Sequence, residues 1–488
     1  MAFQSGKLYV DSSGMTLLDS AGASFSSAHS IGAPYAELQH DSDYGLMGGR
    51  TGLFHYIDNP LNTGARNTST GDKTASTNWQ HPYEDEHGFV DGKTLAVGNN
   101  LVVVRVGGSV KVYTINGDLV TTIRYDDAPF GPYNDYDFAR AVAIGSGRIV
   151  VCNPYETGAV NSGYAFLYNL KGDLIKHLSY GSFDNYSDDA YVRYEDPVIP
   201  SANPGRRLNG YGVSCAIGED RIVIGSPYGY KAGAGLATNS ASFDGAGSFH
   251  IYDLELNHIR VIPNPDPSNS NDPGDHFGMA IAIGDGRIVV GAPNYDGASS
   301  KGAIFVFDLD GSFIKKVEAP FSDTTGNFGN AVAVGNGRIV VGNYKSSTAY
   351  VYDLNGTFIN NDNGVAGKGR GYSVAVSDGK ILVSTRLENN LPSGFGRDGN
   401  GSVELFDLGL NSLGTLSYPL DSYGGALLSD SDRFGETIAM DNGIIAVSAP
   451  GVDTAGSTDA GKVYLYSTTK QPSAIFWNKG FEHHADSI

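Results

Sequence analysis

Two acidic, tyrosine-rich segments contain the side chains whose types and spacing could support chemistry, at residues 125–137 and 184–196. Carboxylates that face each other across a cleft could act as acid and base on a sugar, and acid-rich loops could hold calcium through oxygen ligands. Tyrosine beside aspartate and asparagine is also typical of partner-binding surfaces, and solvated loops are the simplest interpretation. The candidate partner-binding residues are Tyr125, Asp127, Tyr133, Asp135, Tyr136, Tyr186, Asp188, Asp189, Tyr191 and Tyr194.

Other short motifs indicate chemistry only weakly. Residues 394–399 have the Gly-x-Gly-x-x-Gly spacing of a dinucleotide loop, but no helix is expected after them and no βαβ unit surrounds them. His483 and His484 lie near the C-terminus, where an exposed tail would bind a metal without specificity. The sequence has no zinc-ligand spacing, no His-Glu-x-x-His motif and no Gly-x-Ser-x-Gly elbow. We therefore expect no enzyme activity, no cofactor and no metal site.

The elements that must position these segments are seven copies of one repeat. The clearest copy runs from Phe277-Gly278 through a turn at Asp285-Gly286 to Gly291-Ala292-Pro293, and continues with an aromatic strand at residues 302–307. A repeat of roughly 40–75 residues with four short strands is typical of radial or stacked β arrays. The copies start at or near Gly88, Phe138, Tyr211, Phe277, Phe328, Gly371 and Phe434.

Each copy joins alternating or β-branched strands by glycine-containing turns. Asn336-Gly337 and Ser146-Gly147 stand where two-residue hairpins need positive φ, and Asn355-Gly356 marks a second hairpin. The third strand at residues 304–307 is apolar on both faces, so neighbouring sheets must cover both of its sides. We therefore predict an all-β fold, a seven-bladed β-propeller of four-stranded antiparallel blades with an N-terminal extension. A β-solenoid is the alternative, but its repeats are shorter and lack paired hairpin turns.

The repeats divide the chain into three predicted regions. These are an N-terminal extension at residues 1–80, the propeller at residues 81–470 and a C-terminal tail at residues 471–488. Residues 6–18 resemble the third strand, turn and fourth strand of a blade, whereas the last repeat has a third strand at residues 461–466 and no clear fourth strand. We therefore predict that the N-terminal segment pairs with the last repeat and closes the ring. A separate attachment region is the alternative.

The composition excludes several classes of protein. The formal net charge of −20 disfavours nucleic acid and anionic membrane surfaces as partners, because both are bound through basic patches. No stretch has the length and apolar character of a transmembrane helix, and the N-terminus lacks the apolar run of a signal peptide. Cys152 and Cys215 lie in predicted strands of adjacent repeats, which favours two buried free thiols over a disulfide.

The repeated Phe-Gly and Gly-Ala-Pro positions resemble the FG-GAP repeat of integrin α-type β-propellers. They include Phe277-Gly278, Phe328-Gly329, Phe434-Gly435 and Ser448-Ala449-Pro450. The resemblance implies a seven-bladed propeller with an adhesion or assembly role, usually outside the cytoplasm. Many family members carry a calcium loop between the first two strands of a blade. Here that connection is only Gly284-Asp285-Gly286, which has too few oxygens to surround calcium, so we do not expect the family's metal site.

An adhesion-type propeller without a secretion signal fits a phage structural protein, which assembles in the cytoplasm and works outside the cell. The Ser-, Gly- and Asn-rich start also resembles virion tail proteins. We predict a non-enzymatic virion component of a tail or fibre, a homo-oligomer in a larger assembly, that mediates assembly or host-surface adhesion. Its partners would be other virion proteins, or a glycan or receptor on the host surface. The alternatives are an extracellular or surface-attached bacterial adhesion propeller and a glycan-active enzyme that uses Asp135 and Asp189.

Overall fold

The structure is a computed structural model of the 488-residue chain. The described residues are 94–106, 108–124, 138–154, 163–179, 210–228, 246–267, 274–295, 301–320, 326–362, 364, 368–386, 401–416, 433–450 and 461–468, with the backbone of 7–11, 14–18 and 52–58. The chain groups into two units. One contains residues 1–43, 420–425 and 472–488, and the other contains residues 44–419 and 426–471. In the first unit, β1 (Lys7–Asp11) and β2 (Gly14–Leu18) pair as an antiparallel hairpin.

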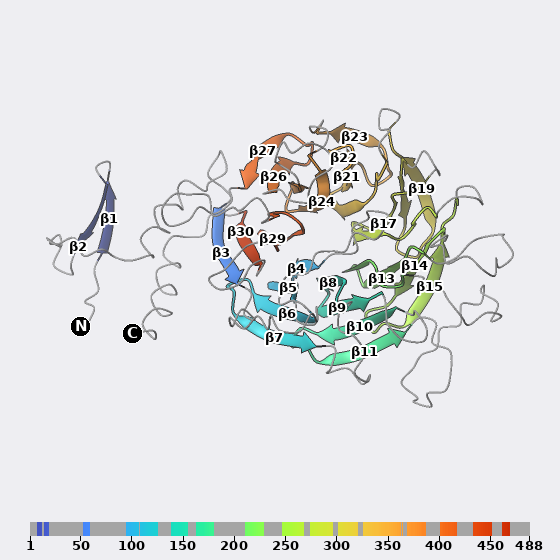
Figure 1. Cartoon of the computed structure of the whole chain (residues 1–488), viewed down its shortest axis with the longest axis horizontal. Helices are drawn as coiled ribbons and strands as arrows, with labels where there is room; N and C mark the ends of the chain where they lie inside the picture. Colours follow the sequence, from blue (N-terminus) through green and yellow to red (C-terminus); the bar gives the residue numbers. More distant parts are fainter. Residues whose placement is uncertain are drawn as a thin grey trace, which may run out of the picture. The chain divides into compact units, whose positions relative to one another are not determined.

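The second unit contains seven antiparallel four-stranded sheets among the described residues, arranged as blades around a central axis (Figure 1). This confirms the predicted seven-bladed β-propeller. Blade 1 consists of β4 (Leu95–Gly98), β5 (Leu101–Val106), β6 (Ser109–Thr114) and β7 (Leu119–Arg124). Blade 2 consists of β8 (Ala141–Gly145), β9 (Arg148–Asn153), β10 (Tyr164–Asn169) and β11 (Leu174–Ser179). Blade 3 consists of β12 (Cys215–Gly218), β13 (Arg221–Ser226), β14 (Ser248–Tyr252) and β15 (His258–Pro263).

The remaining blades repeat this order, with the first strand nearest the axis and the fourth on the outside (Figure 1). Blade 4 consists of β16 (Ala280–Gly284), β17 (Arg287–Ala292), β18 (Ala303–Phe307) and β19 (Phe313–Glu318). Blade 5 consists of β20 (Ala331–Gly335), β21 (Arg338–Asn343), β22 (Thr348–Tyr352) and β23 (Phe358–Asn361). Blade 6 consists of β24 (Arg370–Ser377), β25 (Lys380–Thr385), β26 (Ser402–Asp407) and β27 (Ser412–Leu416). Blade 7 consists of β28 (Ile438–Asp441), β29 (Ile444–Ala449), β30 (Lys462–Ser467) and β3 (Gly52–Asp58).

The strand that completes blade 7 comes from the N-terminal region. β3 pairs antiparallel with β30, from Gly52 opposite Ser467 to Asp58 opposite Lys462. Residues 6–18, which we expected in this role, contribute instead to the separate β1–β2 hairpin. The physical reason is that a hairpin satisfies its inner backbone hydrogen bonds locally, whereas a single strand needs a partner edge and Gly52–Asp58 finds one in β30.

The turns between first and second strands connect neighbouring blades at five boundaries among the described residues. Asp285 and Gly286 have φ of 51° and 73°, the left-handed conformation that a two-residue hairpin needs, and the predicted turns at 336–337 and 146–147 share it. The Asp285 carboxylate accepts a hydrogen bond of 2.6 Å from the Gly337 amide of the next blade. The same contact joins Asn99 to Gly147, Glu219 to Gly286, Asn336 to Gly379 and Asp378 to Gly443.

The glycines of the repeat meet at the boundaries between blades. A Cβ atom on Gly291 of blade 4 would lie 2.0 Å from the carbonyl oxygen of Gly329 in blade 5, so a larger residue would force the blades apart. Gly329 has a φ of 89°, which residues with a side chain rarely adopt. The same approach joins Gly225 to Gly278 and Gly342 to Gly371. The glycines of the Gly-Ala-Pro and Phe-Gly positions therefore set the spacing of these blades together.

Both faces of the third strand of blade 4 are buried between blades, as its apolar composition predicts. In blade 4, Phe305 packs in one cluster with Phe249 of blade 3, and Val306 packs in another with Val341 of blade 5. These side chains have no exposed surface. Apolar surface is therefore buried continuously from one blade to the next, which a single four-stranded sheet could not achieve.

The two cysteines lie at the boundary between blades 2 and 3. Cys152 of β9 and Cys215 of β12 are free and buried in one apolar cluster, which confirms the prediction of buried thiols. Burial raises the pKa of the Cys152 thiol, and its hydrogen bond and charge interaction with Cys215 add to this shift. The two thiols therefore pack as small apolar groups within this cluster.

Candidate functional site

All ten predicted partner-binding residues lie outside the described residues, in segments 125–137 and 180–200. These segments connect β7 to β8 and β11 to β12, and so join the outermost strand of one blade to the innermost strand of the next. The glycine motif at 394–399 and the C-terminal histidines also lie outside the described residues. A partly described connection of the same type runs from β23 to β24, and the candidate site lies beside it.

Most blades are fixed by one aromatic pair. The first member precedes the residue of positive φ that leads into the innermost strand, and the second member lies on the third strand. In blade 4 these residues are Phe277 and Phe305, with ring centroids 5.1 Å apart and an edge-on geometry. Ring contacts of 5.1–5.7 Å occur at the same positions in Phe138–Phe166, Tyr211–His250, Phe328–Tyr350 and Phe434–Tyr464.

Blade 6 replaces this aromatic pair by an ion pair. Arg370 precedes Gly371, which has a φ of 79°, and Glu404 stands opposite Val383, as Phe305 stands opposite Val290 in blade 4. The Arg370 guanidinium donates to Oε2 of Glu404 at 2.7 Å. Among the described blades in which both positions are visible, only blade 6 has charged side chains at both.

The Arg370 guanidinium has further partners that fix its position. Its Nε donates a short hydrogen bond to Asp362, whose side chain is 2% exposed, and its Cζ atom lies 5.2 Å from the ring centroid of Phe406. Glu404 also accepts a 2.5 Å hydrogen bond from Ser412. Burial lowers the pKa of Arg370, but the charges of Asp362 and Glu404 and their hydrogen bonds outweigh it, so the pKa rises. Arg370 therefore stays charged and rigidly held.

An open pocket of about 450 Å³ adjoins this network between blades 5 and 6. The volume lies within the range of small-molecule sites. Two carboxylates and two cations line it, so its formal charge is zero. Its polar lining residues are Asn361, Asp362, Lys368, Arg370, Thr385, Glu404 and Ser412, and its apolar ones are Phe406 and Leu410.

A second polar cluster lies at the boundary between blades 3 and 4, but it leaves the aromatic pair in place. Lys316 donates to Asp266 and to the Tyr295 hydroxyl at 2.6 Å each, and to Glu318 at 2.7 Å. Its ammonium also lies 4.5 Å from the Tyr295 ring centroid. The hydrogen bond to Lys316 lowers the pKa of Asp266. The side chains of Asp266 and Glu318 are more than half exposed, so this cluster resembles a surface ion network.

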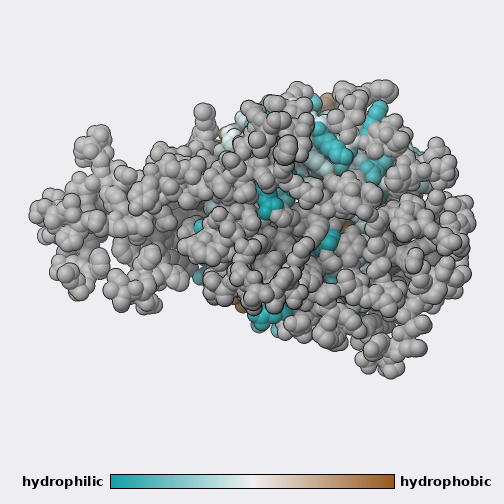
Figure 2. Space-filling model, in the orientation of Figure 1, coloured by the Kyte–Doolittle hydropathy of each residue, from teal (hydrophilic) through white to brown (hydrophobic). Residues whose placement is uncertain are grey.

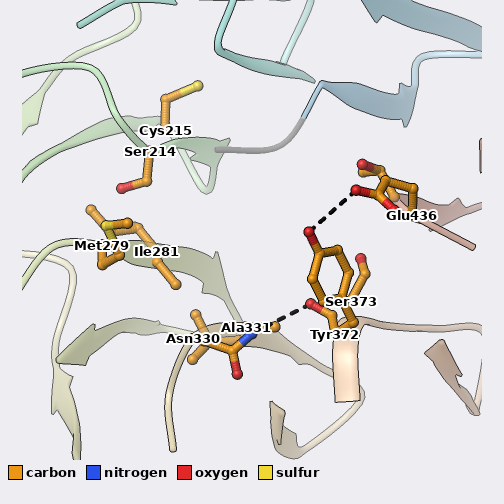
Figure 3. Close-up of a pocket in the computed structure, with 12 residues that line it drawn as sticks. Ser214, Cys215, Met279, Ile281, Asn330, Ala331, Tyr372, Ser373 and Glu436 are labelled. Carbon is orange, nitrogen blue, oxygen red and sulfur yellow. Dashed lines mark hydrogen bonds between the residues drawn. The ribbon is translucent and has the colours of Figure 1, made fainter. Parts of the chain in front are cut away.

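A third polar group, drawn in Figure 3, lies at the starts of the innermost strands of blades 5, 6 and 7. Tyr372 donates to Oε1 of Glu436 at 3.2 Å, and Asn330 donates to the Tyr372 carbonyl oxygen at 3.5 Å. Arg386 lies 3.6 Å from Oε2 of Glu436 and 4.6 Å from the Tyr372 ring centroid. The cavity beside these residues has a volume of about 40 Å³, and Ser214, Met279 and Thr437 also line it. It has room for a few water molecules but not for a larger ligand.

Other kinds of site are not found in the part of the chain that the structure describes. No group of three or more His, Cys, Asp or Glu side chains is placed to hold a metal ion there, and no helix there could cross a membrane. The described residues visible in Figure 2 are mainly hydrophilic.

The comparisons with known proteins agree with the repeat pattern. The family profile described as FG-GAP repeat matches residues 269–307 and 428–466, which contain the first three strands of blades 4 and 7. The described sheets define a seven-bladed β-propeller, and two of its blades, 4 and 7, match the FG-GAP repeat. The predicted FG-GAP resemblance is therefore confirmed at these two blades.

Other comparisons add little. No curated protein sequence matches the chain. Among solved structures, a crystal structure of the computationally designed Ika8 protein is similar over 77% of this chain and 96% of its own, with 12% identity and a TM-score of 0.39.

The Arg370 site was not predicted, although the sequence contains a signal for it. In the sixth repeat Arg370 precedes the glycine, whereas Phe277, Phe328 and Phe434 precede the glycine in other copies. Aligning Arg370 with Phe277 and Glu404 with Phe305 shows two charges where five other blades carry aromatic residues, and blade 1 carries Lys111 at the third-strand position. Two opposite charges at paired apolar positions indicate an ion pair and a local specialisation.

Proposed function

We propose that this protein is a non-enzymatic binding module that holds its ligand or partner at the pocket between blades 5 and 6. The observation that supports the proposal is the exchange of an aromatic pair for Arg370 and Glu404 beside that pocket. Proteins tend to break their own local rules at functional sites.

The energetics of this exchange favour a functional interpretation. A largely buried ion pair loses solvation that its attraction only partly returns, and an apolar pair of similar size is often at least as stable. Five other blades use ring pairs at this position. Stability alone therefore gives no reason for the charges in blade 6, whereas recognition of a polar ligand does.

The hydrogen bonds of the two carboxylates fit binding better than proton transfer. Asp362 accepts from Arg370 and from the Ala349 amide, and Glu404 accepts from Arg370 and Ser412. Such groups are already oriented by the protein and can present their remaining lone pairs to a ligand. The absence of enzyme activity stays a prediction.

The more specific role of a virion component in adhesion or assembly rests on the sequence arguments. A rigid ring of blades suits such a role, because its connections can vary while the packed blades stay fixed. Mass spectrometry of purified particles should detect the chain at a fixed ratio to other virion proteins. Particles that lack the chain would contradict the virion role and leave a surface adhesion propeller.

Binding by the full chain tests the broader proposal. The intact protein should bind its particle or cell surface in a pelleting assay, and the variant Asp362→Asn/Arg370→Phe/Glu404→Tyr should bind at least tenfold more weakly. Binding that the variant leaves unchanged would move the site elsewhere, and no binding by the unaltered chain to either surface would contradict the proposal.

A further inference from the structure

We infer that the pocket between blades 5 and 6 binds a neutral, hydroxyl-rich ligand, namely a saccharide. This inference rests on the proposed function and names the ligand class of the same site. It follows from what the lining of the pocket can and cannot recognise.

The lining disfavours a mainly apolar ligand. Phe406 and Leu410 are its large apolar side chains, and they are only 3% and 6% exposed. The Arg370 guanidinium also stacks over Phe406. An apolar ligand would therefore bury little apolar surface in exchange for desolvating charged groups.

The charges of the lining disfavour a strongly ionic ligand. Asp362 and Glu404 both pair with Arg370, which leaves this trio with one negative charge, and Lys368 supplies one positive charge. An anionic ligand would approach two carboxylates, and a cationic ligand would approach Lys368 and Arg370. Neither sign gains a net attraction from a lining whose formal charges cancel.

A ligand with many hydroxyl groups matches this lining. Each hydroxyl donates one hydrogen bond and accepts others, so it can use carboxylate oxygens, amides, hydroxyls and cationic N–H groups alike. The pocket offers all four kinds, from Glu404, Asn361, Ser412 and Arg370 among others. Because the Arg370 network is rigid, its hydrogen-bonding groups are already in position before the ligand arrives.

The test is a glycan array probed with the labelled full chain, followed by titration calorimetry with the best glycan. The array contains neutral hexose and N-acetylhexosamine glycans together with sialylated and sulfated ones. We expect binding to neutral glycans and at least a tenfold loss of affinity in Asp362→Asn/Arg370→Phe/Glu404→Tyr. Asn361→Leu, which changes a lining residue outside the trio of Arg370, Asp362 and Glu404, should also weaken binding. Lys316→Met, in the polar cluster between blades 3 and 4, should bind as the unaltered chain does.

The outcomes separate this inference from the proposed function. Neutral-glycan binding that neither pocket variant weakens overturns the site, and a preference for sialylated or sulfated glycans overturns the ligand class. If no glycan binds but the full chain still binds its particle or cell surface through the pocket, the saccharide is wrong and the proposed function stands. If the chain binds neither, both are wrong.

Discussion

Blades 4 and 6 place different side-chain chemistry on the same backbone arrangement. In both, the chain turns through a glycine of positive φ into the innermost strand, and the residue before that glycine reaches a side chain on the third strand. Blade 4 fills this contact with Phe277 and Phe305, whose side chains have no exposed surface. Blade 6 fills it with Arg370 and Glu404, next to an open pocket.

The difference shows that a blade can change the chemistry of one pair of side chains while its backbone contacts are kept. The glycine contacts between blades are kept, since Gly371 approaches Gly342 as Gly329 approaches Gly291. Only the side chains at the paired position change their chemistry. A propeller can therefore gain a polar site at one blade boundary without changing the geometry of the ring.

The largest expected effect on stability comes from breaking the aromatic pair of blade 4. Phe277→Ala should lower the free energy of unfolding by about 3–5 kcal/mol, because it leaves a cavity in a core shared by blades 3 and 4. Chemical denaturation measures this change. The control is Phe313→Ala on the outer strand, where the side chain is 49% exposed and the loss should be about 1 kcal/mol. Equal losses in the two variants would contradict the assigned packing.

In blade 6, the stability of a variant should depend on how many charges of the ion network remain without a partner. Arg370→Met alone leaves Asp362 and Glu404 without their cation and should lower the free energy of unfolding by about 3 kcal/mol. Asp362→Asn/Arg370→Phe/Glu404→Tyr removes all three charges, keeps an acceptor for the Ala349 amide and should recover most of that loss. Denaturation of both variants measures it. A triple variant that is less stable than Arg370→Met would show that the ion network is structural.

Blade 3 gives a pH-dependent version of the comparison, because its aromatic pair contains His250. Burial, with a smaller contribution from the charge of His258, lowers the pKa of His250 from 6.5 to about 3. Below pH 6.5, His250 is protonated in the unfolded chain but stays neutral in the folded chain until the pH approaches 3. The contribution of His250 to the free energy of unfolding is therefore fully present above pH 6.5. It falls by up to about 1.4 kcal/mol per pH unit towards pH 3.

His250→Phe, which places the residue of blades 2 and 4 in blade 3, should reduce this loss of stability in acid. Denaturation midpoints at pH 7 and pH 5 measure the effect, and the difference between them should shrink in the variant. An unchanged difference would mean that other groups control acid stability.

The smallest expected effect concerns the turns that all blades share. Asp285→Ala removes the acceptor for the Gly337 amide and should lower the free energy of unfolding by about 0.5–1 kcal/mol. Asp285→Asn keeps an acceptor and the left-handed turn conformation, so it should be nearly neutral. Thermal melting of both variants checks the contrast. A larger loss in the asparagine variant would mean that the charge is essential.

Much of the fold could be predicted because the same pattern of strands and turns recurs in several copies of the repeat. Asp285-Gly286 and its counterparts predict the inner hairpins, and Ile304–Phe307 predicts burial on both faces. The closing strand was harder to find, since Gly52–Asp58 pairs with residues more than 400 positions away and follows no copy of the repeat. The Arg370 site was missed because it is a departure from the repeat, and a pattern search finds what recurs.

The ladder between β3 and β30 determines how the ring responds to force. Gly52 stands opposite Ser467, so the chain enters and leaves the propeller at the same end of two antiparallel strands. Tethers that pull on the two chain ends would load these backbone pairs one after another, as a zipper opens, and would not shear them together. We expect blade 7 to open first under such a load.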